Sequence, residues 1–370
     1  MIVMNNSAIS EQLQRILGSY LSIGKVTEIK PFGSGHINST FSVTAEKGRF
    51  VLQRINNYVF PDPQGLMENV KGVTEFIIKK TAEQGLDTSR CTLKIVNTDN
   101  GELLYFSEND GYWRMYEFVE NSVSYDVVAS AEDFKKSAEA FGEFQRILAD
   151  YPAHTLCEPI KNFHTTPVRF ESFKKALELN KSGRADMAKA EIDFVLSREG
   201  FTQVLERAHA EGRLPLRVTH NDTKLNNILF DADSGEAVCV VDLDTVSPGY
   251  SVTDFGDAIR FGANTAEEDE KDISKVSLDL ELFRAYAEGF LKGCNGSLEL
   301  EEVKLLPEGA MMMTIECGMR FLTDFLDGDL YFKTAYAEHN LVRCRTQLAL
   351  FADMERKKAQ MEEIIAELVK

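Results

Sequence analysis

Two aspartates and one asparagine near the middle of the chain have the residue types and the spacing that phosphoryl transfer requires. They are Asp222, Asn227 and Asp242, and the first two lie in the segment HNDTKLNN at 220–227. The transition state of this reaction is loose and carries its charge on the phosphoryl oxygens, so catalysis needs mainly positioning and charge neutralisation. We expect Asp222 to orient and deprotonate an attacking hydroxyl, and Asn227 and Asp242 to hold Mg²⁺ on the phosphates of ATP. An Asp followed five positions later by an Asn is also the catalytic-loop spacing of kinases.

The segment after this loop predicts a β-hairpin. Residues 227–230 and 237–242 are apolar, β-prone runs joined by the turn-rich stretch 231–236. Folding about Ser234–Gly235 would bring Asn227 opposite Asp242 at the open end, with both side chains on one face. Two oxygen ligands would then converge on a hard cation such as Mg²⁺. This register is an inference, because a slip of one residue would spoil the pairing.

Three further polar residues surround this group. We interpret His220 as a structural brace of the loop. Lys224 is either a point charge that reaches the γ-phosphate or a solvated loop lysine. Asp254 begins an Asp-Phe-Gly tripeptide, the metal-binding signature of protein kinases, but the hairpin already supplies Asp242. We therefore expect Asp254 to cap a helix that begins near Phe255, by accepting backbone N–H hydrogen bonds.

The composition limits the class of protein. The 370 residues are 44% hydrophobic and 27% charged, which is enough for a large core and for two lobes. The 41 basic and 59 acidic residues give a net charge of −18, which argues against nucleic acid or an anionic membrane as a partner. The six cysteines show no metal-binding spacing and indicate reduced thiols. We find neither a signal-peptide pattern nor an apolar run of 18 residues, so the expected location is the cytoplasm.

Periodicity divides the chain into a β-rich first third and a mostly helical remainder, which predicts an α+β bilobal fold like that of protein kinases. We place the N-lobe at 1–120 and the C-lobe at 121–370. Predicted strands lie at 26–32, 36–44, 49–55, 93–96, 103–106 and 113–118. Predicted helices lie at 11–21, 66–84, 278–291, 308–327 and 338–368, and another opens at Ser130.

Two N-lobe segments are candidates for nucleotide contact. Gly33-Ser34-Gly35 lies between two predicted strands, where glycines would allow the backbone to approach the ATP phosphates. The chain has no G-x-x-x-x-G-K-[ST] motif, which excludes a P-loop NTPase. The last N-lobe strand leads directly into the second lobe, and at such a junction a bilobal kinase offers backbone groups to adenine. This points to Glu117, Phe118 and Val119.

With these motifs in place, the chain resembles the aminoglycoside phosphotransferase/choline kinase superfamily, and within it the bacterial N-acetylhexosamine 1-kinases. The resemblance covers almost the whole chain. The stretches that carry it are GSGHINSTF, RFVLQRINNYVFPDP, WRMYEFVENSVSYD, LRVTHNDTKLNNIL, VVDLDTVSPG, DFGDAIRFGA, ECGMRFLTDFLDGDLYF and EHNLVRCRTQ. The catalytic loop specifies only the superfamily, whereas GHIN together with GMRFLTDFLDGDLYF is much narrower.

The resemblance implies a sugar site as well as a catalytic centre. It makes Asp222 the base for the sugar hydroxyl and assigns the metal to Asn227 and Asp242. It also implies that five residues surround the sugar: His36, Thr245, Phe261, Arg320 and Tyr331. A 2-acetamido sugar presents hydroxyls and an amide, which need rigid polar partners and an aromatic surface. Ordinary core packing is the alternative for the two aromatic residues.

The chain departs from the superfamily at one position. The third N-lobe strand normally ends in Leu-Lys, whose lysine neutralises the α- and β-phosphates, but here Gln53 stands in that place. Gln53 brings no charge, and Arg54 should point to the opposite face of the strand. The substituting cation is left open, as is its partner on the following helix, for which Glu68 and Glu75 are both candidates.

Three functions are compatible with these features. The first is an ATP-dependent kinase for the anomeric hydroxyl of N-acetylglucosamine or N-acetylgalactosamine. The second is a kinase for another small alcohol, such as an aminoglycoside, choline or homoserine. The third is a nucleotide-binding pseudokinase, prompted by the missing lysine. The presence of Asp222, Asn227 and Asp242 together argues against the third, since only catalysis requires all of them.

Overall fold

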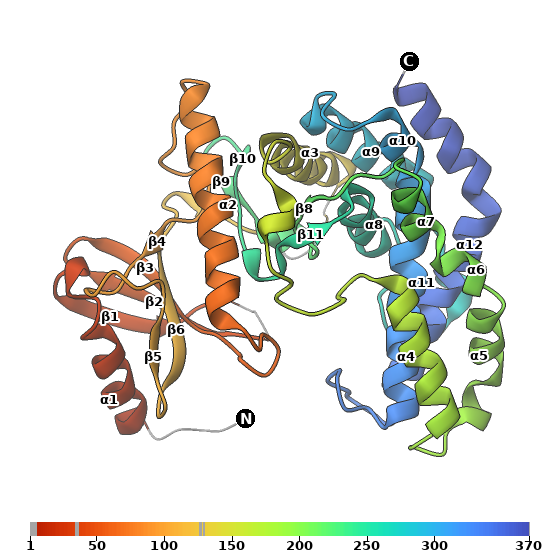
Figure 1. The fold of residues 1–370 in the computed structure, drawn as a ribbon, viewed down its shortest axis with the longest axis horizontal. Coiled ribbons are helices and arrows are strands. Elements are labelled where there is room, and N and C mark those ends of the chain that lie inside the picture. Colours follow the sequence, from red (N-terminus) through yellow and green to blue (C-terminus); the bar gives the residue numbers. More distant parts are fainter. Residues whose placement is uncertain (1–5, 34–36, 126–127, 129, 370) are drawn as a thin grey trace.

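The computed structural model describes residues 6–33, 37–125, 128 and 130–369. Its first part is an antiparallel sheet with strand order β1-β2-β3-β6-β4, in which β5 also pairs with β6 (Figure 1). Side chains alternate between its faces, so Phe50 and Leu52 pack toward the first helix while Val51 packs on the other side. The elements of this lobe are α1 (Asn6–Leu17), β1 (Val26–Pro31), β2 (Ser39–Ala45), β3 (Gly48–Arg54), α2 (Pro63–Glu83), β4 (Ile95–Val96), β5 (Tyr105–Ser107) and β6 (Gly111–Glu117).

Helix α2 lies between the sheet and the second lobe (Figure 1). Asp62 caps its first turn by accepting a hydrogen bond from Gly65 N, and Pro63 opens it. Its buried face packs on residues of both lobes, including Tyr116 of the sheet and Val246 near the catalytic loop. The buried Asn69 adds two interlobe hydrogen bonds, to the carbonyls of Val246 and Cys157. These contacts join the sheet to residues 217–249, which we call the catalytic segment because they contain the predicted catalytic loop and hairpin.

The second lobe is built on a core of helices. Helices α11 and α12 run side by side, and α8 packs on α11 (Figure 1). Gly256 and Gly309 permit that last approach, because a Cβ on either would meet backbone atoms of the other helix at 2.1–2.2 Å. The helices are α3 (Ala131–Ile147), α4 (Thr166–Leu179), α5 (Lys189–Leu196), α6 (Glu199–Thr202), α7 (Val204–Ala210), α8 (Ser251–Gly262), α9 (Leu280–Cys294), α10 (Leu300–Lys304), α11 (Leu306–Asp327) and α12 (His339–Leu368).

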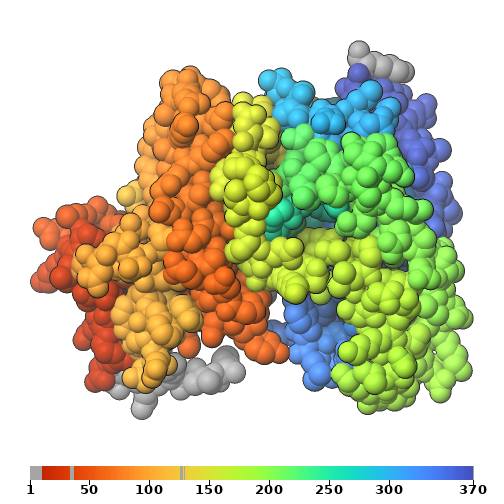
Figure 2. All heavy atoms as spheres, viewed as in Figure 1, coloured from red at the N-terminus to blue at the C-terminus, as the bar shows by residue number. Residues whose placement is uncertain are grey.

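Short strands carry the catalytic segment across this lobe. They are β7 (Ser122–Val123), β8 (Arg217–Thr219), β9 (Ile228–Asp231), β10 (Ala237–Val240) and β11 (Ser247–Gly249). Two single 3₁₀ turns interrupt them, η4 (Leu225–Asn227) and η5 (Leu243–Thr245). Figure 2 shows the face on which the chain after α3 fills the space between α2 and the second lobe, while the two lobes separate toward the lower edge of the view.

The predicted α+β bilobal architecture is confirmed. Ser130 caps α3 as expected, accepting a hydrogen bond from Asp133 N. The leading helix is displaced from the predicted 11–21 and ends at Leu17. The division at residue 120 stays a prediction. Among the described residues, no helix is both long and apolar enough to cross a membrane.

Candidate active site

The carboxylate of Asp222 is held between a cation and an amide. Lys224 Nζ lies 2.7 Å from Asp222 Oδ1, and Asn227 Nδ2 donates to Asp222 Oδ2 at 3.0 Å and to its carbonyl at 2.8 Å. The side chain of Asp222 is still 27% exposed. It can therefore accept a further hydrogen bond from a ligand without losing these contacts.

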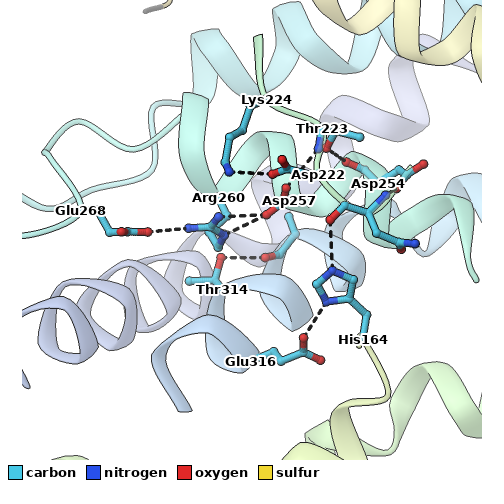
Figure 3. Close-up of polar contacts among 12 residues, drawn as sticks. His164, Asp222, Thr223, Lys224, Asp254, Asp257, Arg260, Glu268, Thr314 and Glu316 are labelled. Atoms are coloured by element: carbon cyan, nitrogen blue, oxygen red, sulfur yellow. Dashed lines mark hydrogen bonds and ion pairs between the residues drawn. The ribbon is translucent and has the colours of Figure 1, made fainter. Parts of the chain in front are cut away.

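Lys224 was expected either to reach the γ-phosphate or to be a solvated loop lysine, and its two carboxylate neighbours help to distinguish these interpretations. Burial lowers the pKa of its ammonium, but Asp222 and Asp257 more than offset this and raise the pKa above its usual value. The group is thus a permanent cation beside the candidate base (Figure 3). This arrangement favours the point-charge interpretation over that of a freely solvated lysine, although the phosphate contact itself stays a prediction.

Asp254 braces the catalytic loop, and the expected role as a helix cap is wrong. Helix α8 begins at Ser251, so Asp254 lies inside its first turn. Its carboxylate accepts hydrogen bonds from the backbone N–H groups of His220 and Asn221, both at 2.8 Å, and from Gln145 Nε2 at 2.9 Å. Burial raises the pKa of Asp254 above its usual value. The prediction that it accepts backbone hydrogen bonds was correct, but the donors belong to a different segment.

His220 is buried and holds the two sides of the loop together, as its interpretation as a brace requires. Its Nε2 lies 2.9 Å from the carbonyl oxygen of Val241, and its ring packs edge-on against Phe141 and Phe144. Thr245, expected near the sugar, contacts the same loop by donating its hydroxyl to the His220 carbonyl at 2.7 Å. Its hydroxyl oxygen can still accept a hydrogen bond, so a sugar contact stays a prediction.

The hairpin forms, but its register differs from the prediction by one residue. Val240 pairs with Ile228, and Val241 N donates to the carbonyl of Asn227. Asn227 therefore lies opposite Val241 rather than Asp242, and a register shift occurs between Ala237 and Cys239. Asp242 follows the end of β10 in the left-handed conformation, with φ 58° and ψ 54°.

The carboxylates near Asp242 fit a divalent cation. Burial among the surrounding protein atoms raises the pKa of Asp242 to about 6, and the nearby Asp244 and Asp222 add to this while Arg114 opposes it. Such crowding of negative charge is relieved by a metal ion. No group of three His, Cys, Asp or Glu ligands occurs among the described residues, but Mg²⁺ often takes only one or two protein oxygens and completes its shell with phosphate and water. Asn227 and Asp242 are the residues that would hold it.

The predicted nucleotide loop lies mostly outside the described residues. Gly33 is described, exposed and has φ 77°, as a glycine turn requires. Ser34, Gly35 and His36 fall outside the described residues, so their roles stay predictions.

At the end of β6 the backbone groups differ in availability. Glu117 N and Phe118 N donate to the carbonyls of Lys94 and Arg49. The N–H of Val119, in contrast, makes no hydrogen bond to any residue described by the structure. Of the three predicted residues, Val119 is therefore the one whose backbone N–H is free to bind a ligand.

Gln53 contacts a cation that sequence reasoning missed. Its Oε1 accepts a hydrogen bond from Arg114 Nε at 3.0 Å, and its Nε2 donates to Thr40 Oγ1. Glu68 and Glu75 are both exposed on α2, and among the described residues neither pairs with Gln53 or Arg114. The sequence did carry a signal: a charged residue in the apolar strand segment YWRMY is rarely buried without a functional or ionic partner.

The aromatic candidates for the sugar site are exposed, and the core-packing alternative is wrong for both. Tyr331 is 60% exposed and Phe261 is 45% exposed. The guanidinium of Arg320 lies 5.9 Å from the Tyr331 ring and 5.2 Å from that of Phe163. The backbone of Tyr331 is fixed because its N–H donates to the buried carboxylate of Asp324 at 2.8 Å. Phe261 lines a separate cavity of about 500 Å³ near the end of α8.

We call Arg320 and Tyr331 the acceptor wall. A largely buried pair of residues, Glu316 and His164, connects this wall to the catalytic loop (Figure 3). Glu316, on α11, lies 2.7 Å from His164 Nδ1 and accepts a hydrogen bond from Thr166 Oγ1 at 2.6 Å. The other ring nitrogen of His164 lies 3.3 Å from the carbonyl oxygen of Asn221. Burial raises the pKa of the Glu316 carboxyl, but His164, and to a lesser extent Arg320 one helical turn later, more than offset this and hold that pKa below the usual range. Sequence reasoning missed both members of this pair.

Solved structures share this fold over nearly the full chain. An aminoglycoside phosphotransferase from Alicyclobacillus acidocaldarius superimposes with a TM-score of 0.61 at 13% identity, covering 96% of both chains. A choline kinase from Cryptosporidium parvum gives 0.58 at 13% identity, covering 99% of this chain and 100% of the other. An ethanolamine kinase from Plasmodium vivax gives 0.56 at 16% identity, covering 94% and 90%. These likenesses concern the fold.

A family comparison goes further, because it concerns the sequence itself. Residues 28–291 match the phosphotransferase enzyme family, and this range contains all but the first two residues of the sheet, together with the Asp222 loop and its hairpin. The match covers more than half of the 370 residues. The chain belongs to the phosphotransferase enzyme family.

Proposed function

We propose that this phosphotransferase moves the γ-phosphoryl group of ATP to the anomeric hydroxyl of N-acetylglucosamine or N-acetylgalactosamine. The observation that carries the proposal is the partly exposed Asp222 carboxylate, which Lys224 and Asn227 orient. The loop that bears it contacts His164, and His164 in turn contacts Glu316 on the helix that also bears Arg320. A base and a polar acceptor wall are thereby linked by one hydrogen-bonded chain.

The acceptor wall favours a neutral substrate over a cationic one. Arg169 is close enough to Arg320 to lower the pKa of the Arg169 guanidinium, in addition to the larger effect of burial. Both cations lie near Tyr331. Two guanidinium groups would repel choline or a protonated aminoglycoside. Arg320 can donate hydrogen bonds to sugar hydroxyls and an acetamide carbonyl, whereas Arg169 already donates two to the carbonyl of Phe163. This is the reason to prefer the sugar over the cationic acceptors named in the fold relatives.

Each residue near Asp222 has a defined task in the proposed reaction. Asp222 accepts the proton of the sugar hydroxyl as that oxygen attacks the γ-phosphorus in line with the departing ADP. Lys224 opposes the negative charge on the transferred phosphoryl oxygens. Bound Mg²⁺ would neutralise charge on the β- and γ-phosphate oxygens, and Asn227 and Asp242 would hold it. Val119 offers its free N–H to the adenine ring, and Gly33 begins the loop proposed to cover the phosphates.

The test is a release assay for ADP with ATP·Mg²⁺ and a panel of acceptors. The panel contains N-acetylglucosamine, N-acetylgalactosamine, glucose, choline, homoserine and kanamycin. We expect turnover with the N-acetylhexosamines and a product whose phosphorus couples to the anomeric proton in NMR. Turnover restricted to choline, homoserine or kanamycin, or phosphorus coupled to the C6 protons, would overturn the proposal. Nucleotide binding without turnover on any acceptor would favour the pseudokinase.

A further inference from the structure

The strand next to β3 supplies a cation at the place where a phosphate-binding lysine is expected. Gln53 and Arg114 are directly paired in the β3–β6 register, so their side chains project from the same face of the sheet. Arg114 Nε donates to Gln53 Oε1 at 3.0 Å. Gln53 therefore positions a guanidinium instead of carrying a charge of its own.

Arg114 faces the candidate metal carboxylates. Its Nη1 lies 2.5 Å from Asp244 Oδ1, and both side chains are almost fully buried, at 1% and 4% exposed. Burial lowers the pKa of the guanidinium, but the charge of Asp244, followed by Tyr116 and Asp242, raises it above the usual value. The group therefore stays charged. It is also close enough to Asp242 for the two charges to interact.

The other basic side chains of the six N-lobe strands point elsewhere. Lys30 is exposed and pairs with Glu28, and Arg49 is exposed and pairs with Glu120. Arg54 is exposed and follows Gln53 on β3, so it projects from the opposite face. Within the described part of the sheet, Arg114 is thus the cation directed at the catalytic segment.

The acidic partner of this cation comes from a different segment than in protein kinases. In protein kinases a glutamate on the helix after β3 pairs with the lysine, but here α2 presents the sulfur of Met67, 3.7 Å from Arg114 Nη1. Asp244, from the turn after Asp242, supplies the negative charge instead. Asn38, just before β2, donates to the other Asp244 oxygen at 2.7 Å and so ties the pair to the β1–β2 loop.

We propose that Arg114 is the cation that neutralises the α- and β-phosphates of the nucleotide, with Asp244 as its positioning partner. The inference rests on the proposed use of ATP. Phosphate oxygens bound to a metal ion held by Asp242 would come close to Arg114, because Arg114 is near enough to Asp242 for the two charges to interact. Asp244 is only two residues from Asp242. The partner of Arg114 and the proposed metal ligand therefore belong to the same turn.

The test compares two ligands by calorimetric titration, Mg·ADP and adenosine, in the absence of any acceptor. Arg114→Met is expected to weaken Mg·ADP binding at least about tenfold, because it removes a buried positive charge close to the phosphates. Adenosine affinity should stay within about twofold, because adenosine has no phosphate for the guanidinium to bind. A merely structural role would lower both affinities or neither.

Arg54→Met is the matched control, since it removes the neighbouring cation on the opposite face and should leave both affinities unchanged. Removing Arg114 alone leaves the Asp244 carboxylate buried without its partner and can impair folding. The double variant R114M/D244N removes both charges, and it should show the same selective loss of Mg·ADP affinity.

The two proposals fail in different ways. Wild-type protein that binds neither Mg·ADP nor adenosine would contradict the proposed use of ATP. Wild-type protein that binds Mg·ADP, with R114M or R114M/D244N binding it equally well, would overturn only the assignment of Arg114.

Discussion

The carboxylate of Glu316 lies 2.7 Å from the Nδ1 atom of His164, inside the second lobe. Neither residue is a candidate for direct contact with the reacting atoms. Because the opposite ring nitrogen of His164 reaches the carbonyl of Asn221, the pair supports the backbone next to Asp222. Glu316 lies one helical turn before Arg320, so the same helix positions both the loop of Asp222 and the acceptor wall.

Glu316→Gln is therefore expected to lower kcat about tenfold while the KM for ATP stays within about twofold, because the contact orients the loop and does not touch the nucleotide. Steady-state kinetics with the acceptor found in the release assay provide the measurement. Glu308→Gln is the control, since Glu308 lies on the same helix as Glu316 but pairs with Lys358 of α12. Equal effects of the two substitutions would contradict the positioning role.

Asp222→Asn should reduce turnover more than a thousandfold and leave ATP affinity nearly unchanged. The carboxamide keeps the shape of the side chain but cannot accept the hydroxyl proton, so the loss belongs in kcat. Turnover within tenfold of the wild type would remove Asp222 from the role of base.

Asp242→Ala and Asn227→Ala should each raise the Mg²⁺ concentration needed for half-maximal activity and lower kcat. Each deletes one oxygen from the proposed ligand set. A titration of activity against Mg²⁺ at saturating ATP gives the result. An unchanged Mg²⁺ dependence in either variant would exclude that residue as a ligand.

Asp254→Ala should lower the free energy of unfolding by about 3 kcal/mol, because three donors around a buried carboxylate lose their acceptor. Loss of an ordinary helix cap would cost only about 1 kcal/mol. Urea unfolding distinguishes the two values. Asp272→Ala is the control, since Asp272 is an exposed cap that accepts from Ser274 N.

Acid should weaken the contact that docks α1 on the sheet. The Arg15 guanidinium lowers the pKa of Asp110 to about 2, with help from the hydroxyls of Tyr105 and Ser107. A carboxyl whose pKa is lowered on folding adds stability above its unfolded pKa of about 3.9, and this contribution disappears as the pH falls toward 2. The difference in unfolding free energy between wild type and Asp110→Asn should thus be constant from pH 6 to 8 and shrink below about pH 4. Glu108→Gln, at an exposed neighbouring carboxylate, should show no such trend.

Local sequence determined much of this protein. The sequence located α11 and α12 to within two residues at each end, because a helix is formed by hydrogen bonds between residues that are close along the chain. The spacing of Asp222 and Asn227 likewise placed both residues in one loop, but their hydrogen bond to each other was found only in the structure. The hairpin was also predicted, although its register at the open end differs from the prediction by one residue.

Only the tertiary structure decided which distant residues share a charge environment. Arg114 and Asp244 are 130 positions apart, and His164 and Glu316 are 152 apart. No local pattern pairs such residues, because their meeting depends on how the sheet, α2 and the helices of the second lobe pack together. Burial then fixes the partner, since a charge removed from water needs an opposite charge or hydrogen bonds nearby. For the same reason Asp254, read from its neighbours as a helix cap, proved to be a brace of the catalytic loop.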